Sequence, residues 1–242
     1  MADVRMRVFN SDGSEAEMCG NGARCVARLV SEWPDRKGGT RRSPREVTID
    51  TAAGTLRAVV QKGRIRMRWP DPTDLHLALE IPVDGRRLHT ACVNTGVPHA
   101  VVPVRALEHV DVNRIGRLLR YHKAFAPRGT NVDFMQADAR DPSRLCVRTY
   151  ERGVEEETLA CGTGVVASAV IHALQQDAAA RRQQRTNGQS RAYQLDVQTR
   201  SGEVMTVSLT VVSEGDGRRV RGLMLDGSAR RICDGTAQWP QQ

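Results

Sequence analysis

Residues 18–23 read Met-Cys-Gly-Asn-Gly-Ala, and residues 160–165 repeat the pattern as Ala-Cys-Gly-Thr-Gly-Val. Each copy leads into a segment with apolar residues at helical spacing, Ala23 to Val30 in the first and Gly164 to Leu174 in the second. Acidic residues precede both copies. Two copies of one turn-and-helix unit indicate a pseudo-symmetric protein in which the two cysteines face each other between its halves.

Short alternating apolar segments surround these two helices and predict β-strands. They lie at residues 5–9, 46–49, 55–60, 64–69, 100–104, 131–135, 145–150, 193–197, 204–211 and 219–225. One shorter helix is expected at residues 112–121. A parallel doubly wound sheet would need a helix between most strands, and the sequence does not supply them. The pattern therefore predicts an α+β fold, with a loop at Glu32–Pro44, an exposed helix end and loop at Gln175–Arg191, and a linker at Pro70–Pro82.

The composition of the 242 residues limits the classes of protein to consider. Hydrophobic residues make up 40% and charged residues 26%, which is typical of a globular chain. The sequence carries neither a long apolar run nor the apolar core of a secretory signal, so we expect a cytoplasmic protein that does not enter a membrane. The formal net charge is +8. Its arginines are dispersed and do not alternate with aromatic residues, so we expect no nucleic-acid partner.

Six cysteines are present, and no pair has the Cys-x-x-Cys spacing of a zinc site. Most are expected to be small buried residues. Cys19 and Cys161 differ because each directly precedes a predicted helix start. Unpaired backbone N–H groups and the positive end of the helix dipole should lower the pKa of such a thiol. The same N–H groups form a site for a carboxylate, which glycine allows to approach closely.

A pair of thiols on opposite faces of a substrate suits inversion at a carbon atom. One thiolate removes a proton from the carbon, and the other, as a thiol, returns a proton from the far side. The α-proton of an amino acid is weakly acidic, so the carbanion needs help from the two helix starts aimed at its carboxylate. The repeated cysteine turn therefore predicts a racemase or epimerase that needs no cofactor.

Two long motifs resemble the signatures of the diaminopimelate epimerase family. They are FNSDGSEAEMCGNGARC at residues 9–25 and TYERGVEEETLACGTG at residues 149–164. Shorter matches lie at residues 94–99, 128–134 and 225–229. Related racemases of proline or hydroxyproline typically carry His where this chain has Asn21, so the first motif favours the diaminopimelate enzyme.

The resemblance implies interconversion of LL- and meso-diaminopimelate in lysine biosynthesis, with no pyridoxal phosphate and no metal. It implies that Cys19 and Cys161 are the catalytic thiols and that His99 and Glu151 tune them. Backbone groups at both helix starts would hold the reacting carboxylate, and four other residues would hold the rest of the substrate. These two sets are Gly20, Asn21, Gly22, Gly162, Thr163 and Gly164, and Asn10, Asn131, Glu151 and Arg152.

The family also implies an architecture of two similar halves, each a curled, mostly antiparallel sheet around a central helix. The halves would cover residues 1–80 and 81–242, the last strand would return to the first half, and the protein would form a homodimer. Relative to the family the chain starts late, and the first strands of the N-terminal half are expected to be missing. Exposed strand edges would follow, so we expect little epimerase activity.

Two alternatives remain open at this point. The chain could be a non-catalytic remnant or binding protein of the same fold, or a related amino-acid racemase. Val97 bears on the second alternative because many family members carry there an Asn that contacts the substrate. Substrate competition would separate these possibilities.

Overall fold

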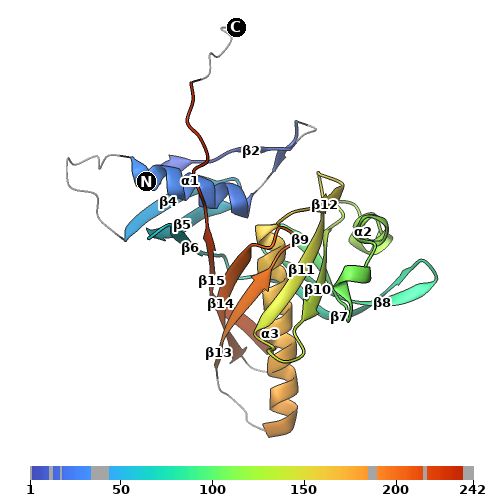
Figure 1. Cartoon of the computed structure of the whole chain (residues 1–242). Helices are drawn as coiled ribbons and strands as arrows, with labels where there is room; N and C mark the ends of the chain where they lie inside the picture. The colour runs from blue at the N-terminus through green and yellow to red at the C-terminus, as the bar shows by residue number, and fades with distance from the viewer. Residues whose placement is uncertain are drawn as a thin grey trace.

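The computed structural model describes residues 2–10, 13–16, 18–33, 44–184, 190–214 and 217–236. Strands are the commonest regular element of this part, and they group around two helices, α1 (Gly20–Glu32) and α3 (Gly162–Gln184) (Figure 1). A shorter helix, α2 (Val112–Arg120), lies mainly against the strands at residues 131–137 and 144–151, and two single turns of 3₁₀ helix follow residues 106 and 122. The fold is α+β, as the sequence predicts.

The first three strands along the chain have two residues each, and the others are longer. They are β1 (Val4–Arg5), β2 (Val8–Phe9), β3 (Glu15–Ala16), β4 (Arg45–Thr51), β5 (Gly54–Gln61), β6 (Arg64–Arg68), β7 (Thr73–Val83) and β8 (Arg86–Asn94). The rest are β9 (Pro98–Pro103), β10 (Asn131–Ala137), β11 (Arg144–Glu151), β12 (Glu156–Thr158), β13 (Arg191–Gln198), β14 (Val204–Glu214) and β15 (Gly217–Ser228).

One continuous sheet runs through the described part of the chain in the order β1-β4-β5-β6-β15-β14-β13-β11-β10-β9-β8-β7, with β12 paired to β11. The hairpin of β2 and β3 stands apart from it. Most neighbours are antiparallel, and the parallel pairs are β1 with β4, β9 with β10, and β11 with β13. The last strand, β15, pairs with β14 on one side and β6 on the other, so it joins the two groups of strands.

The two central helices are buried to different degrees. Eight apolar side chains of α3, from Val165 to Leu174, have at most 1% of their surface exposed. Strands β8 to β11 and β13 to β15 surround this helix. It is therefore apolar on most of its faces, and not along a single stripe. Helix α1 lies against β4, β5 and β6 and leaves Cys25 and Leu29 exposed. The two helices contact each other near their N-terminal ends.

The structure corrects the predicted linker at Pro70–Pro82, because residues 73–83 form strand β7. The strand lies at the end of the sheet, where Pro82 pairs with Arg87. An edge strand has one side without strand partners, so the missing N–H of a proline is tolerated there. Pro82 therefore lies in a strand at the sheet edge and not in a linker.

Smaller differences concern the boundaries of elements. The strand expected at residues 5–9 is divided into β1 and β2, because the Met6 N–H bonds to Asp50 O and the chain then leaves the sheet. Helix α3 continues ten residues beyond Leu174 into the segment predicted as a helix end and loop. Residues 34–43 and 185–189, which belong to predicted loops, lie outside the described residues. The division into halves at residue 80 stays a prediction.

Candidate active site

The two cysteine turns have the same backbone plan, and each cysteine stands directly before its helix. The carbonyl of Cys19 accepts the Ala23 N–H at 2.9 Å, and the carbonyl of Cys161 accepts the Val165 N–H at 2.9 Å. The Cys19 Sγ caps α1 by accepting the Gly22 N–H at 3.3 Å. The sulfur therefore takes the position that an N-cap oxygen usually holds, next to the unpaired N–H groups of the first turn.

The starts of α1 and α3 meet directly. A Cβ placed on Gly20 would come within 3.3 Å of the Gly162 Cα and 2.9 Å of the Trp69 ring. Only glycine fits at this contact without displacing a neighbour. The N–H groups at the starts of both helices are thereby brought to one place, where a carboxylate could bind.

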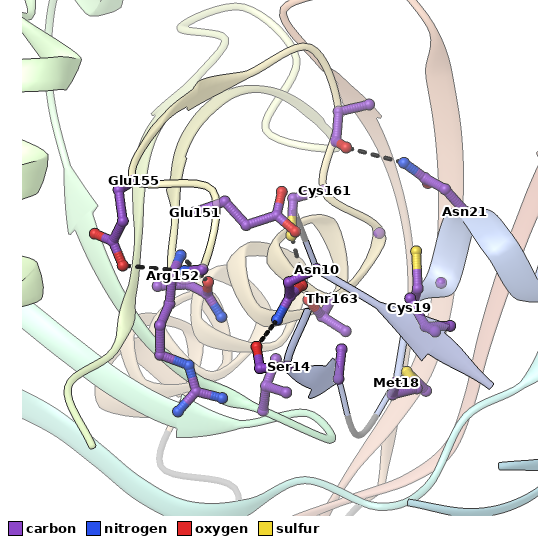
Figure 2. Close-up of a pocket in the computed structure, with 18 of the residues that line it drawn as sticks. Asn10, Ser14, Met18, Cys19, Asn21, Glu151, Arg152, Glu155, Cys161 and Thr163 are labelled. Carbon is purple, nitrogen blue, oxygen red and sulfur yellow. Dashed lines mark hydrogen bonds between the residues drawn. The ribbon is translucent and has the colours of Figure 1, made fainter. Parts of the chain in front are cut away.

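A cavity of about 350 Å³ lies between the two turns, and both cysteines line it (Figure 2). Its walls come from the β2–β3 hairpin, the starts of α1 and α3, and the ends of β10 and β11. Residues far apart in the sequence, Asn10 and Arg152 among them, face the same space. The volume suits a small polar molecule.

Most residues expected to form the site line this cavity, and three do not. Those on its wall are Asn10, Cys19, Gly20, Asn21, Asn131, Glu151, Arg152, Cys161, Gly162 and Thr163. Gly22 and Gly164 lie one position deeper in their helices, and His99 is absent from the lining. Val97, where many family members carry Asn, does line the cavity.

His99 lies in a buried polar layer behind the cavity wall. It is 1% exposed, and its Nδ1 is 2.7 Å from Asp133 Oδ2. The other oxygen of Asp133 accepts a hydrogen bond from the Thr149 hydroxyl at 2.8 Å. His99 Nε2 is buried and has no hydrogen-bond partner among the described residues. The carboxylate of Asp133 fixes which ring nitrogen carries a proton, because a carboxylate can only accept.

The pKa values of two acidic groups that line the cavity are raised. Burial raises the pKa of the Cys161 thiol, and the nearby carboxylates of Glu151 and Asp133 raise it further. Burial is also the largest cause of the raised pKa of Glu151. The lowered pKa expected for both thiols is therefore wrong for Cys161. The helix start favours its thiolate, but burial and two negative charges outweigh that effect.

The far end of the cavity, away from the helix starts, carries opposite charges. Arg120 on α2 donates from Nε to Glu155 Oε1 at 3.1 Å, and both residues line the cavity beside Arg152. The Asn131 side chain accepts the Arg152 N–H at 2.8 Å and donates to Pro98 O at 3.2 Å. A ligand with both an amino and a carboxyl group would find partners of each sign here.

Sequence reasoning missed five residues that build or border this site: Trp69, Thr95, Arg120, Asp133 and Glu155. Trp69 packs on Gly20 and donates from Nε1 to Thr95 O at 2.8 Å, and the Thr95 hydroxyl donates to Thr163 O at 3.1 Å. Trp69 therefore supports both turns. Its signal in the sequence was weak, a single tryptophan at the end of a predicted strand.

The described residues contain no group of three or more His, Cys, Asp or Glu side chains placed to hold a metal ion. Among the helices of the described part, none is both long and apolar enough to cross a membrane.

Comparisons with known proteins identify relatives over nearly the whole chain. The family model described as diaminopimelate epimerase matches residues 1–67 and 91–212. The diaminopimelate epimerase of Aquifex aeolicus (strain VF5) is 38% identical over 235 residues, which are 96% of this chain and 74% of that protein. The diaminopimelate epimerase of Archaeoglobus fulgidus is 44% identical over 183 residues, 70% of this chain and 61% of its own.

Solved structures show the same fold at low sequence identity. A hydroxyproline epimerase from Agrobacterium vitis, solved with trans-4-hydroxy-L-proline bound, superposes with a TM-score of 0.66 at 19% identity, covering 94% of this chain and 68% of that one. A probable proline racemase from Agrobacterium radiobacter K84 gives a TM-score of 0.63 at 17% identity, covering 95% and 72%.

Proposed function

The chain belongs to the diaminopimelate epimerase family, and we propose that its cavity interconverts LL- and meso-diaminopimelate with Cys19 and Cys161 as the two proton-transferring groups. The observation that carries the proposal is the placement of both cysteines, each directly before a helix, on one cavity where the two helix starts touch. The chain is accordingly an isomerase.

The proposed chemistry divides the substrate between two parts of the cavity. The reacting carboxylate would lie at the joined starts of α1 and α3, where the backbone N–H groups of Gly20, Asn21, Gly162 and Thr163 would stabilise negative charge. The distal amino and carboxyl groups would lie toward Asn10, Asn131, Glu151 and Arg152. Because diaminopimelate carries one amino-acid group at each end, it matches a cavity with partners of both signs at its far end.

One thiolate takes the α-proton, and the electron pair remains on the α-carbon, shared with the carboxylate. The second thiol then gives its proton to the opposite face and becomes the thiolate. The raised pKa of Cys161 keeps this group protonated and suits it to donate, while Cys19, whose sulfur accepts the Gly22 N–H, suits the role of base. In the reverse reaction, Cys19 and Cys161 exchange these two roles. Glu151, as a half-buried carboxylate beside Cys161, would exchange protons with that thiol.

The proposal is tested by incubating the chain with LL-diaminopimelate in heavy water. We expect loss of the α-proton signal and formation of the meso isomer, measured by NMR and chiral chromatography. Cys19→Ala and Cys161→Ala should each lower the inversion rate by at least about a hundredfold, the scale of one acid or base group. Cys146→Ala is the matched control, because Cys146 is exposed on β11 and does not line the cavity.

An inversion rate that survives either cavity substitution would refute the two-thiol assignment. Inversion of proline but not of diaminopimelate would favour a related racemase, and binding without exchange would favour a non-catalytic protein.

The family resemblance supports three further proposals: a homodimer, action in the cytoplasm, and two halves that divide near residue 80. Light scattering coupled to size-exclusion chromatography tests the first, since a mass near twice 26.7 kDa is expected.

A further inference from the structure

Helix α1 carries a buried cation that does not line the cavity. Arg24 is 3% exposed and follows Cys19 by little more than one helical turn. Taking a guanidinium out of water is costly unless acceptors surround it. The sequence motif contains this arginine, but neither the expected chemistry nor the cavity wall assigns it a role.

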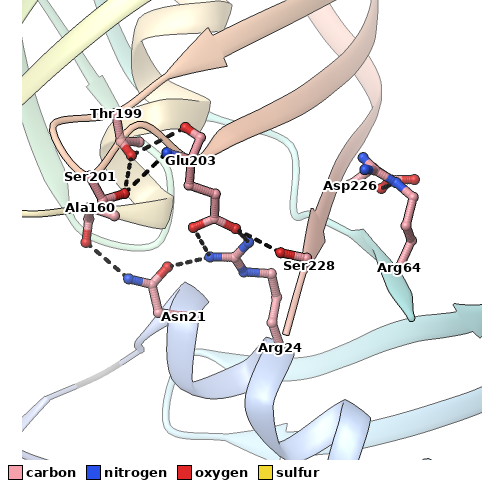
Figure 3. A network of polar contacts seen from close by, with 9 residues as sticks. All are labelled: Asn21, Arg24, Arg64, Ala160, Thr199, Ser201, Glu203, Asp226 and Ser228. Atoms are coloured by element: carbon pink, nitrogen blue, oxygen red, sulfur yellow. Dashed lines mark hydrogen bonds and ion pairs between the residues drawn. The ribbon is translucent and has the colours of Figure 1, made fainter. Parts of the chain in front are cut away.

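The partners of Arg24 lead to the second cysteine turn (Figure 3). Its Nη1 donates to Glu203 Oε1 at 2.7 Å, and its Nη2 donates to Asn21 Oδ1 at 2.9 Å. Asn21 Nδ2 in turn donates to Ala160 O at 2.9 Å. Ala160 is the residue directly before Cys161. Three hydrogen bonds therefore connect the start of β14, the first turn of α1 and the backbone that positions the second sulfur.

The charge of Arg24 also fixes the orientation of the Asn21 amide. A guanidinium can only donate, so Asn21 must turn its oxygen to Arg24 and its NH₂ to the Ala160 carbonyl. Both polar groups of this side chain are thereby occupied, which leaves the backbone of Asn21 to face a ligand. Strand β15 encloses Arg24 on another side, since a Cβ on Gly227 would come within 2.1 Å of its Nη1.

We infer that Asn21, Arg24 and Glu203 form a strap that holds the two cysteine turns at the separation required for proton transfer on opposite faces of the substrate. Arg24 is in this scheme a positioning residue, acting through Asn21 on the turn that carries Cys161. The inference rests on the proposed epimerase function.

The strap predicts a specific change in how the carbanion is reprotonated. In the intact enzyme one sulfur removes the proton and the opposite sulfur returns one, which inverts the carbon. If the Cys161 turn shifts away, the first thiol exchanges its proton with heavy water and returns a deuteron to the same face. The substrate is then labelled with retained configuration, and inversion becomes the rarer outcome.

The experiment compares deuterium incorporation with retention and with inversion, at initial rates, in the full chain. Arg24→Met removes the charge and both donors, and Glu203→Gln keeps the shape of the acceptor as a milder change. We expect the ratio of retention to inversion to rise about fivefold or more in Arg24→Met, which corresponds to roughly 1 kcal/mol between competing barriers. Glu203→Gln and Arg24→Lys should give intermediate ratios. Partial unfolding would lower both products equally and leave the ratio unchanged.

Arg64→Met is the matched control. Arg64 pairs with Asp226 across β6 and β15, near the same junction, and contacts neither cysteine turn (Figure 3). Its ratio should equal that of the unsubstituted chain.

A second readout does not depend on epimerase activity. Iodoacetamide labelling of Cys161, followed by peptide mass spectrometry, should be faster in Arg24→Met than in Arg64→Met because the released turn exposes a buried sulfur. A chain that labels in this way but does not invert diaminopimelate supports the strap and refutes the proposed function. An unchanged ratio in an active enzyme, or unchanged labelling of Cys161, overturns the strap.

Discussion

The two glycines that follow the cysteines by three residues, Gly22 and Gly164, are equivalent in the sequence repeat but not in the structure. A Cβ on Gly22 would meet only ordinary contacts, the nearest at 3.5 Å from Cys19. A Cβ on Gly164 would lie 2.2 Å from Asp133 Oδ1, more than an ångström closer than ordinary contact begins. Gly164→Ala should therefore be far more damaging than Gly22→Ala.

The size of the effect follows from what Asp133 would lose. This carboxylate has no exposed surface and is held by His99 and Thr149 at 2.7 and 2.8 Å. Overpacking costs about 1–3 kcal/mol, and a displaced hydrogen bond to a charged group about 1.5–3 kcal/mol. The better helix propensity of alanine offsets up to about 1 kcal/mol of this cost. We expect Gly164→Ala to lower the free energy of unfolding by about 2–4 kcal/mol, and Gly22→Ala to change it by less than about 1 kcal/mol.

Urea unfolding followed by circular dichroism measures both values, and the midpoint of thermal unfolding should fall by about 5–15 °C for Gly164→Ala. The cause is tested in the Asp133→Ala background, where the obstacle is gone and Gly164→Ala should cost little more. Equal stability of the Gly22→Ala and Gly164→Ala variants would refute the reasoning. So would an undiminished cost of Gly164→Ala once Asp133 has been removed.

Three further predictions concern single groups. Glu151→Gln removes a charge that raises the pKa of Cys161, so the pH midpoint for alkylation of Cys161, measured by mass spectrometry, should move down; an unmoved midpoint would contradict this. Burial raises the pKa of Cys92 to about 11, so above pH 9 the unfolded chain binds fewer protons than the folded one and stability falls as the pH rises. Between pH 9 and 11, Cys92→Ala should remove about 1 kcal/mol of this loss of stability, measured by urea titration; the value is reduced for the partial exposure of the thiol. If the free energy of unfolding falls with pH equally steeply in the variant, Cys92 is not the source of the loss. Trp69→Phe leaves Thr95 O without its donor and should cost about 1–3 kcal/mol of stability with a slower inversion rate, whereas Trp33→Phe, on the exposed end of α1, should do neither.

The local features of the fold were accessible from the sequence. Helix α1 begins at Gly20 as predicted, because glycine spacing and apolar periodicity are properties of neighbouring residues. Most strands were found for the same reason. Strand β7 was missed because its prolines suggest a linker unless the strand is known to lie at a sheet edge, and that position depends on how the whole sheet is ordered.

The sequence predicts only those cavity residues that lie within its recognisable motifs. Both cysteines and most of the expected binding residues do line one space. The sequence did not predict the roles of Asp133, Trp69 and Glu203, because each acts through a contact with a segment far away in the sequence. Glu203, for example, lies 179 positions from its partner Arg24. Nothing in the residues around Glu203 distinguishes it from the many other carboxylates of the chain. Its role appears only when β14 and α1 are brought together.

The direction of the Cys161 pKa shift shows most clearly why a repeated motif does not imply a repeated environment. Both sulfurs stand before a helix, and the dipole acts on each in the same sense. The second turn packs beneath strands β10 and β11, which place Asp133 and Glu151 beside its sulfur and bury it. The first turn faces the small β2–β3 hairpin and keeps a partly exposed sulfur. A two-sided proton transfer needs one protonated and one deprotonated thiol at the moment substrate binds. Two identical environments would not decide which thiol keeps its proton, whereas burial and two neighbouring carboxylates make Cys161 the thiol that keeps it.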